Sequence, residues 1–432
     1  MSIIKATAKI NSIFLAVILI VGTFAAVYPS FIIGVQAQAE YEYDSNSYNS
    51  EYPPSEYPPS EYPPSEYPPS EYPPSEYPPS EFEPENKKNN YYYPPKNPIS
   101  ADIVVPVDFP TIQQAINEAN EDDTIEVLPG TYTEQLTINK TLTIIGSGVK
   151  STIIEAPPLE ELKLNVIGLP YIVEVNDEAE VTIEGFTILG PEITDCGQLI
   201  GVSVLENGTI NLKHSNIKGC TQNSVGVGFE GDGHATIAKT FITDYREHGV
   251  FAFGSGTTLT MSDNKVIGSA PEEPGIIGIL SVLSKVTITH NEVSKNICNH
   301  PDCGPNFLNQ TQAFGIVAVV PDQGSVISKN YLSNNDGGID VEGASGCCRV
   351  DQNKLTDNRF FGVTIVDGEH TISNSKIFGG KVGAAAIAFF EANTTATLDQ
   401  VKIIGAETPI QALSTGNLTA AVNVLSPSVF LP

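Results

Sequence analysis

The sequence predicts an all-β chain built as a β-solenoid, in which short strands repeat along one axis. A six-residue pattern recurs about every 27 residues: an aliphatic residue, two polar residues, a small residue or Asn, one further residue and a second aliphatic residue. Its copies run from Ile183 to Ile188, Leu212 to Ile217, Ile237 to Ile242, Met261 to Val266, Ile288 to Val293, Ile327 to Leu332, Val350 to Leu355, Ile372 to Ile377 and Leu398 to Ile403. Second apolar runs, such as Gly201–Val204 and Gly315–Val319, lie between the copies. These runs are short and alternate instead of following a helical period, so each turn of the chain should contribute two or three strands.

The fourth position of the pattern is Asn in four consecutive copies, namely Asn264, Asn291, Asn330 and Asn353. Asn tolerates the left-handed turn conformation, and stacked Asn side chains can hydrogen-bond along the axis of a solenoid. We therefore expect a structural Asn ladder in the middle of the stack. The flanking copies carry Phe186, Ser215, Thr240, Ser375 and Val401 at this position.

A short amphipathic segment precedes the repeats. Residues 111–119 place apolar side chains at Ile112, Ala115, Ile116 and Ala119, and Pro110 suits the first turn of a helix. Such a helix would cover the open first coil and protect its strand edges, as a solenoid requires.

The start of the repeats carries a family resemblance. The segments Phe109–Ile116, Leu128–Glu134 and Leu142–Gly148 together resemble the opening of pectin-lyase-like right-handed parallel β-helix proteins. They are most similar to the NosD-type and the carbohydrate-binding and sugar-hydrolase repeat proteins of that group. The resemblance covers residues 102–425 and implies a right-handed parallel β-helix over residues 101–432. At a step of about 27 residues, this body should contain about twelve coils. Lyases, hydrolases, esterases and non-enzymatic modules share this scaffold, so the resemblance implies a fold without an activity.

The first hundred residues predict export and a spacer. Lys5 and Lys9 precede an apolar run, and Ala37-Gln38-Ala39 follows it, which is the layout of a secretory signal peptide over residues 1–39. The alternative is an uncleaved membrane anchor, which would be the chain's only tether to a membrane. The unit Glu-Tyr-Pro-Pro-Ser then repeats from Glu51 to Ser80. Pro-Pro pairs prevent helix and sheet pairing, so residues 40–100 should form a disordered Pro/Tyr-rich tail, acting as a stalk or as a linker without a partner. We expect an extracellular or cell-surface protein.

The charge balance excludes some partners. The chain carries 22 Lys+Arg against 51 Asp+Glu, a formal net charge of −29. Nucleic acid and anionic lipid both require a basic face, so neither is expected as a partner. The same surplus of acid disfavours uronate polymers and leaves other polysaccharides or cell-envelope glycans as the expected partners.

Three carboxylates are the candidate catalytic residues. The segment Asn335–Asp340 is similar to the Asn-Thr-Asp-Gly-x-Asp region of polygalacturonases, with an extra Gly and without the later motifs. Inverting glycosidases hold two carboxyl groups roughly 6.5–9.5 Å apart, and Asp336 with Asp340 or Glu342 could reach that separation. Turn propensity favours the alternative, an Asn-Asp-Gly turn that leads into a strand. Gly130–Glu134 matches the first motif of pectin methylesterases, but the Trp-containing later motif cannot exist in a chain without Trp.

Acidic residues also recur near the ends of the second apolar runs, at Glu206, Glu230, Asp322, Glu342, Asp367 and Glu391. If their registers align, several would stack at about the 4.8 Å strand spacing, where like charges repel. Such a column either extends into water or holds Ca²⁺, with Glu206, Glu230, Asp367 and Glu391 as candidate ligands. A solvated edge is favoured because no Ca²⁺-loop motif is present, so no cofactor is certain from the sequence and Ca²⁺ is the candidate at this edge.

Six cysteines in an exported chain favour disulfides. Cys196 and Cys220 are one coil apart, and Cys298, Cys303, Cys347 and Cys348 form a second group with Cys298 and Cys303 in an insertion from Lys295 to Gln312. A bond between the adjacent Cys347 and Cys348 would be strained, so we expect these two to bridge back to Cys298 and Cys303. Zn²⁺ binding with His300 is the alternative.

Five Asn-x-Ser/Thr triplets fit an exported, glycosylated surface; they begin at Asn139, Asn207, Asn309, Asn393 and Asn417. Together these observations predict an exported β-helix that acts as a carbohydrate-binding or structural envelope module without turnover. The alternatives are a polysaccharide-active enzyme of hydrolase, lyase or pectinesterase type, and a Ca²⁺-stabilised adhesin.

Overall fold

The structure is a computed structural model. It describes residues 100–424 except 192–198, 206, 220–223, 231–232, 270–275, 307–309, 344–347, 380–384, 391–393, 407 and 413–418. The expected signal peptide and, apart from Ser100, the expected stalk lie outside these residues. The chain divides into the units Met1–Asn90 and Tyr91–Pro432, and the described residues belong to the second. No described helix is long and apolar enough to cross a membrane.

The described chain winds through three parallel sheets, here called A, B and C in the order in which each coil enters them. Sheet A contains β1 (Ile103–Val105), β2 (Thr124–Val127), β5 (Leu142–Gly146), β8 (Glu180–Glu184), β11 (Thr209–Lys213), β14 (His234–Ala238), β17 (Thr258–Ser262), β20 (Lys285–Thr289), β23 (Ser325–Ser328), β26 (Cys348–Asp351), β29 (Glu369–Ser373), β32 (Thr395–Ile404) and β34 (Thr419–Val424). Sheet B contains β3 (Gly130–Thr133), β6 (Thr152–Glu155), β9 (Thr187–Leu189), β12 (Asn216–Lys218), β15 (Phe241–Thr243), β18 (Lys265–Ile267), β21 (Glu292–Ser294), β24 (Tyr331–Ser333), β27 (Lys354–Thr356), β30 (Lys376–Phe378) and the second half of β32. Sheet C contains β4 (Leu136–Ile138), β7 (Tyr171–Val175), β10 (Leu199–Val204), β13 (Ser224–Glu230), β16 (His248–Phe253), β19 (Ile277–Val282), β22 (Phe314–Val319), β25 (Gly337–Glu342), β28 (Phe361–Val366), β31 (Ala385–Phe390) and β33 (Thr408–Ala412).

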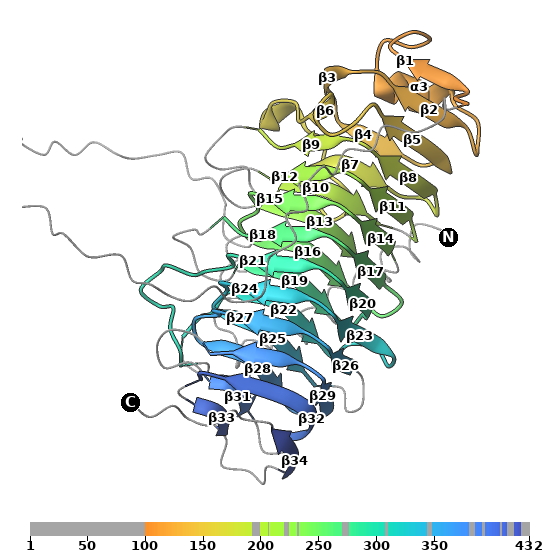
Figure 1. Ribbon diagram of the computed structural model, residues 1–432. Coiled ribbons are helices and arrows are strands. Elements are labelled where there is room, and N and C mark those ends of the chain that lie inside the picture. The colour runs from red at the N-terminus through yellow and green to blue at the C-terminus, as the bar shows by residue number, and fades with distance from the viewer. Residues whose placement is uncertain are drawn as a thin grey trace, which may run out of the picture. The chain divides into compact units, whose positions relative to one another are not determined.

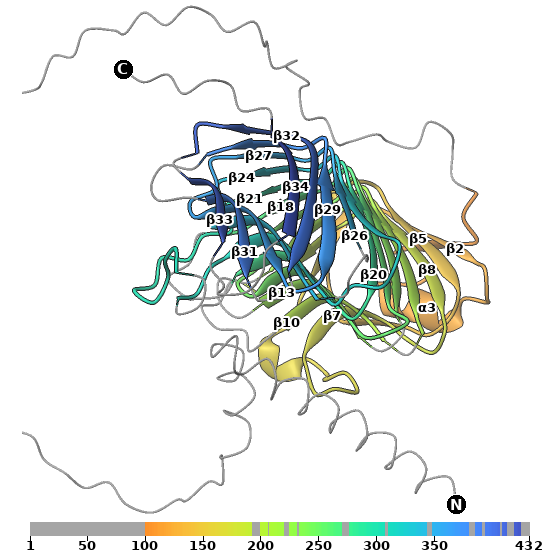
Figure 2. The ribbon, with the colours of Figure 1, turned by 90° about the horizontal axis from the view of Figure 1, so that it is seen from below.

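The predicted parallel β-solenoid is confirmed. The coils stack along one axis (Figure 1), and the view roughly along the stack places the three sheets around a shared interior (Figure 2). Sheet C has 11 strands, one from each coil, so the described residues form eleven coils where about twelve were expected. Inward positions of successive coils are aliphatic and fully buried, for example Val202, Val250 and Ile316. Each such side chain contributes about 1.5–3 kcal/mol when it leaves water.

The helix α3 (Ile112–Glu118) covers the first coil, as predicted, and buries Ile112, Ala115 and Ile116. The Glu134 carboxylate accepts hydrogen bonds from the backbone N–H groups of Ile112 and Gln113, both at 2.9 Å. At the opposite end, Lys140 Nζ donates to the carbonyl of Asn117 at 2.6 Å. Both charges complement the helix dipole. Glu134, the acid of the esterase-like motif, therefore serves as a helix cap in this chain.

The corner between sheets A and B carries the expected Asn ladder. Asn264 donates from its backbone N–H (3.0 Å) and its side-chain Nδ2 (2.9 Å) to Asn291 Oδ1. Asn291 donates in the same way to Asn330, and Asn330 to Asn353. All four side chains are 1% exposed. These bonds satisfy the buried amide groups of the turn, which would otherwise cost free energy.

One detail of this corner differs from the expectation. The left-handed conformation belongs to the residue before each ladder Asn, with φ of 58° at Asp263, His290 and Lys329 and 55° at Gln352. This residue makes the sharp bend, and the Asn that follows can then point inward and bond to its neighbours. The ladder residues are thus hydrogen-bonding residues, and their tolerance of positive φ is not used.

The corner between sheets B and C contains a second ladder that the sequence patterns did not predict. Asn296 donates to Asn335 Oδ1 from its N–H (3.1 Å) and Nδ2 (2.9 Å), and Asn335 donates to Asn358 Oδ1 at 3.1 Å from both groups. The buried Tyr245 donates its hydroxyl to Asn296 Oδ1 at 2.7 Å and closes the N-terminal end. The signal is present in the sequence, since each of these Asn residues lies five positions after an Asn of the first ladder, such as Asn291.

A column of glycines follows this second corner at the start of sheet C. The column contains Gly201, Gly226, Gly249, Gly278, Gly315 and Gly338. A Cβ atom on Gly226 would lie 2.4 Å from the carbonyl oxygen of Gly249, and one on Gly338 would lie 2.5 Å from that of Gly362. The coils approach too closely here for any side chain, so glycine is required by contact rather than by backbone angle.

Candidate functional site

Asp340 and Glu342 lie on β25 and point away from the core. Ile339 and Val341, which alternate with them, are 0% and 1% exposed inside the coil, so the two acids project from the outer face of sheet C. Residues two apart on a strand have Cα atoms about 6.6 Å apart, close to the carboxyl separation of inverting glycosidases. The structure therefore brings these two candidates together on one face.

Neither carboxylate is open to solvent. Asp340 is 1% and Glu342 is 7% exposed. The register places Asp340 between Val317 and Thr364, and the Thr364 hydroxyl donates a hydrogen bond to Asp340 Oδ1. Glu342 lies between two valines on the same neighbouring strands. A substrate carboxyl or glycosidic oxygen could not approach either acid without displacing its surroundings.

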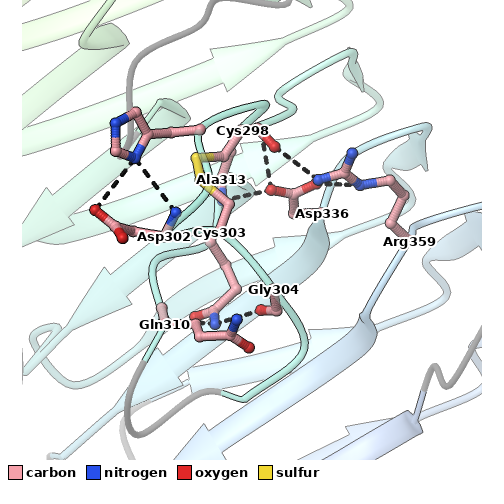
Figure 3. Close-up of a disulfide and its surroundings, with 10 residues drawn as sticks. Cys298, Asp302, Cys303, Gly304, Gln310, Ala313, Asp336 and Arg359 are labelled. Carbon is pink, nitrogen blue, oxygen red and sulfur yellow. Dashed lines mark hydrogen bonds and ion pairs between the residues drawn. A yellow bond between two sulfur atoms is a disulfide. The ribbon is translucent and has the colours of Figure 1, made fainter.

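Asp336 does not share this face. It lies at the corner before β25 and is fully buried, and its Oδ2 accepts hydrogen bonds from the backbone N–H groups of Cys298 (3.0 Å) and Ala313 (3.2 Å) (Figure 3). Cys298 lies near the start of the insertion from Lys295 to Gln312, and Ala313 directly follows its end. Asp336 therefore joins the two ends of the inserted loop.

Arg359 completes this arrangement. Its Nε lies 2.7 Å from Asp336 Oδ1, and its Nη2 donates to the carbonyl oxygen of Cys298 at 2.7 Å (Figure 3). The Nε–H is not aligned with Oδ1, so the contact is an ion pair without a hydrogen bond. Burial raises the pKa of Asp336, and the Cys298 amide, the Arg359 charge and the Ala313 amide oppose that shift. Two backbone amides bind Oδ2, and Oδ1 faces the Arg359 guanidinium, which is the geometry of a structural anchor.

Arg359 and Thr364 were not among the predicted site residues. Asp336 follows Asn335, and Arg359 follows Asn358, at equivalent positions of successive coils. If the coils are aligned on the Asn residues of the second ladder, Asp336 and Arg359 fall at the same position of neighbouring coils. The sequence could have predicted the pair in this way.

His248 lies on the outer face of sheet C, on β16, and its ring stacks on Phe251 with centroids 5.4 Å apart. Burial lowers the pKa of His248 to about 4, against a smaller opposing effect of a backbone hydrogen bond at Glu247. The imidazole is therefore neutral near pH 7 and has no proton to give as a general acid there.

The acidic edge proposed for Ca²⁺ is interrupted. Glu230 and Glu342 share one register position of sheet C, but Phe253, Val282 and Val319 occupy that position on the strands between them. Four strand steps separate the two positions by about 19 Å. Asp367 accepts a 2.8 Å hydrogen bond from the Gly368 N–H within its own turn. Asp322 lies in a different turn, where its N–H donates to the carbonyl oxygen of Ser284 at 3.1 Å.

Glu206 and Glu391 lie outside the described residues, as does the side chain of Glu230. Within the described parts of the chain, no group of three or more His, Cys, Asp or Glu could hold a metal ion. The Ca²⁺ site stays a prediction, and a Ca²⁺-stabilised adhesin gains no support from the described residues.

The cysteines are arranged differently from the expectation. Cys298 is paired with Cys303, and their Cα atoms are 5.9 Å apart, within the range of a disulfide (Figure 3). Bridges from these two residues to Cys347 and Cys348 are therefore not what the structure contains, because the turn between Cys298 and Cys303 brings them against each other. Cys348 is buried on β26, and Cys196, Cys220 and Cys347 lie outside the described residues.

The comparisons with known proteins agree with this architecture. A family model described as "Right handed beta helix region" matches residues 171–403, more than half of the chain. This chain belongs to the right-handed β-helix family. No curated protein matches it.

Solved structures similar to this family member have low identity. The Dettilon tailspike protein is 13% identical with a TM-score of 0.43, over 68% of this chain and 62% of that chain. The catalytic unit of a thermostable GH87 alpha-1,3-glucanase from Streptomyces thermodiastaticus strain HF3-3 is 15% identical with a TM-score of 0.38, over 73% of this chain and 65% of that chain. An alginate lyase from Paenibacillus sp. str. FPU-7 is 12% identical with a TM-score of 0.35, over 72% of this chain and 95% of that chain. The chain thus spans less than two thirds of the first two proteins, and these similarities assign no reaction to it.

Proposed function

We propose that this β-helix is an exported module that binds a polysaccharide of the cell envelope or its surroundings without turnover. In this proposal the β-helix is displayed on the Glu-Tyr-Pro-Pro-Ser stalk and works as a surface. It holds its ligand by repeated contacts along the stack.

The occlusion of the candidate acids carries this proposal. Asp336, Asp340 and Glu342 are 0%, 1% and 7% exposed. Asp336 anchors the insertion, and Asp340 accepts a hydrogen bond from Thr364. General acid–base catalysis requires a carboxyl group within hydrogen-bond reach of the substrate. Their geometry favours binding over hydrolysis.

The outer face of sheet A offers the contacts that a glycan needs. One outward row is polar on seven successive strands, and it contains Thr124, Thr143, Thr182, Asn211, Thr236, Thr260 and Thr287. These side chains are partly or fully exposed. Each hydroxyl can both donate and accept a hydrogen bond, and the row repeats at about 4.8 Å. Such a row suits the hydroxyl groups of a sugar chain laid along the axis.

Export is part of the same proposal. The basic residues, apolar run and Ala37-Gln38-Ala39 support secretion. Asn139 and Asn207, two of the predicted glycan acceptors, are exposed, as an acceptor must be. The Cys298–Cys303 pair fits an oxidising compartment.

A glycan array combined with a reducing-end assay tests the proposal. We expect the full chain to be retained on at least one glycan and to release no product. Replacing three hydroxyls of the sheet A row, as Thr182→Val, Thr236→Val and Thr260→Val, should weaken retention about tenfold. Thr371→Val, an exposed position on sheet A outside this polar stretch, is the matched control. Retention unchanged by the triple substitution would contradict the use of this face.

A second candidate function is glycan hydrolysis, which the paired outward positions of Asp340 and Glu342 favour. The same assay separates the two. Product release that disappears in Asp340→Asn would establish turnover and would overturn a purely binding role.

A further inference from the structure

Three lysines form a column on the outer face of sheet B. Lys354, Lys376 and Lys402 are in register on three successive coils, and all three are exposed. The next residue on each strand points into the core; these residues are Leu355, Ile377 and Ile403. The three side chains therefore project outward from neighbouring strands at about the 4.8 Å strand spacing. We call them the lysine column.

Among the residues that the structure describes, the lysine column has no acidic partner. Like charges directly opposite each other on neighbouring strands are destabilising. Acids are abundant in this chain, with 51 Asp+Glu against 22 Lys+Arg, yet none of the three lysines forms an ion pair with any residue that the structure describes. Nearer the N-terminus, the same row pairs its charges, since Lys265 Nζ lies 2.6 Å from Glu292 Oε2 on the adjacent strand. The repulsion among the three lysines is thus uncompensated at the C-terminal end of this row, whereas the charges at its N-terminal end are paired.

Aromatic rings flank the column. Lys354 Nζ lies 5.1 Å from the centroid of the Tyr331 ring and 5.9 Å from that of Phe378. Tyr331 precedes Lys354 in the same row and is 37% exposed, among the most exposed large apolar side chains described. Phe378 lies two residues after Lys376 and shares its face. Ring faces and ammonium groups therefore stand side by side on one surface.

We propose that the lysine column, with Tyr331 and Phe378, binds an acidic polysaccharide. The ammonium groups pair with carboxylate or sulfate groups on nearby sugar units, and the rings pack against the apolar faces of the sugars. The ligand removes the repulsion that the fold leaves uncompensated. Although the acidic chain as a whole disfavours uronate polymers, this face is locally basic and accepts them.

Charge density distinguishes this ligand from other polyanions. Duplex DNA carries one negative charge per 1.7 Å or so, and an acidic body repels such a density over its whole length. A uronate polymer carries about one carboxylate per sugar, a much lower charge density than that of duplex DNA, so the column can offset the repulsion. The stalk offers one Glu per five residues, or about one per 15 Å in an extended polyproline conformation. A single stalk carboxylate would then face a column about 10 Å long, which makes the stalk the weaker occupant.

Retention of the full chain on immobilised polygalacturonate, with neutral dextran as the reference, tests the inference. We expect retention at low salt that falls as salt is added. Lys354→Gln, Lys376→Gln and Lys402→Gln together should weaken it about tenfold, whereas the corresponding three Lys→Arg substitutions should retain it. The matched control is Lys150→Gln, Lys239→Gln and Lys285→Gln, which replaces three exposed lysines outside the strands of sheet B and removes the same charge. It should change retention less than about twofold.

Three results would overturn the inference. The first is no retention of the wild-type chain on polygalacturonate. The second is an equal loss in the control triple variant, which would show a general charge effect. In the third, retention appears only after the stalk residues Glu51, Glu56, Glu61, Glu66, Glu71 and Glu76 are changed to Gln, which would identify the stalk as the occupant.

The inference rests on the proposed glycan-binding role but can fail separately from it. Retention on a neutral glycan with no effect of the lysine column would leave the proposed function intact and reject this ligand. Binding of polygalacturonate through the column with release of products would support the inference and reject binding without turnover.

Discussion

Both ladder-bearing corners of the coils are held by stacked polar side chains, but the length of the connecting segment varies much more at one corner than at the other. At the corner between sheets A and B, two residues connect the strands in nine coils, for example Asp263 and Asn264 between β17 and β18; the exceptions are the five residues between β5 and β6 and the continuous strand β32. At the corner between sheets B and C, the connection ranges from the two residues between β3 and β4 to the insertion that begins at Lys295. Both corners bend at a left-handed residue and then bury a polar side chain.

The difference shows where this fold admits variation. The first ladder extends from Thr240 to Ser375 without a gap, and every link ties one coil to the next. The second ladder ends at Tyr245, and beside it the Asp336–Arg359 pair has to anchor the insertion. A corner whose amides are all satisfied within the ladder leaves no group free to hold an insertion, whereas the second corner supplies separate anchors.

The largest expected effect comes from breaking the first ladder. Asn330→Ala removes the acceptor of the Asn291 N–H, which is buried, and also the donor to the Ile288 carbonyl. We expect a loss of about 3 kcal/mol in the free energy of unfolding, measured by urea denaturation. Asn211→Ala, on the outer face of sheet A, is the control and should cost less than about 0.5 kcal/mol.

Two glycines of β13 sharpen the comparison at the second corner. Gly226→Ala would place its Cβ 2.4 Å from the Gly249 carbonyl oxygen, whereas Gly228→Ala would meet nothing closer than 3.5 Å. We expect Gly226→Ala to cost about 2 kcal/mol and Gly228→Ala to be nearly neutral, in the same denaturation assay. Equal effects of the two substitutions would contradict the close approach of the coils.

The anchor of the insertion should show a more local effect. Asp336→Asn removes the charge facing Arg359 and should cost about 1–2 kcal/mol, because Arg359 is partly exposed and screened. Limited proteolysis should then cut within the insertion faster than in the wild type. Asp302→Asn, which removes an exposed contact to His300 in the same loop, should leave the cleavage rate unchanged. Unchanged cleavage in both variants would mean that Asp336 does not anchor the loop.

Removing one hydroxyl tests the end of the second ladder. Tyr245→Phe keeps the buried ring and deletes the hydrogen bond to Asn296. The expected cost is about 1 kcal/mol, measured by thermal or urea unfolding. A stability equal to that of the wild type would show that the Asn296 oxygen is satisfied in another way.

The smallest effect is a pH dependence at the first corner. Burial alone would raise the pKa of Asp351, but hydrogen bonds from Asn374, Ser373 and Gln352 and the Arg349 charge lower it overall. A lowered folded pKa adds stability above the unfolded value of about 3.9, and that stability is lost as the pH falls through the folded value. Unfolding titrations should show a shallower acid-side decline in Asp351→Asn. An unchanged decline would count against this role.

The sequence patterns predicted what repeats most strictly. The spacing of Asn264, Asn291 and Asn330 sufficed for the first ladder, because the two-residue corner keeps its register constant. The second ladder and the Asp336–Arg359 pair required knowledge of how far each loop displaces the chain, and loop length varies at that corner. The aliphatic alternation predicted the core, but it could not show that glycine is required at Gly226 while Gly228 has room.

The candidate site was harder to predict for a related reason. The sequence placed Asp336, Asp340 and Glu342 within one segment, but it did not show that a bend separates Asp336 from the other two. The lysine column was also present in the pattern, since Lys354, Lys376 and Lys402 all occupy its fifth position. Only the register shows that this position faces outward on one sheet and that no acid interrupts the three lysines.

The first ladder also has a direction. Every link from one ladder position to the next donates from the earlier coil to the later one, beginning with the Thr240 N–H and ending at the Ser375 hydroxyl oxygen, while the Nδ2 groups also donate back to carbonyls such as that of Ile288. The amide dipoles therefore add head to tail, as they do in a helix, and polarise one another. This corner of the β-helix is thus electrically polar along its length, with its positive end toward the C-terminal coils. A buried acceptor such as Ser375 is stabilised at that end, where a buried donor would be repelled.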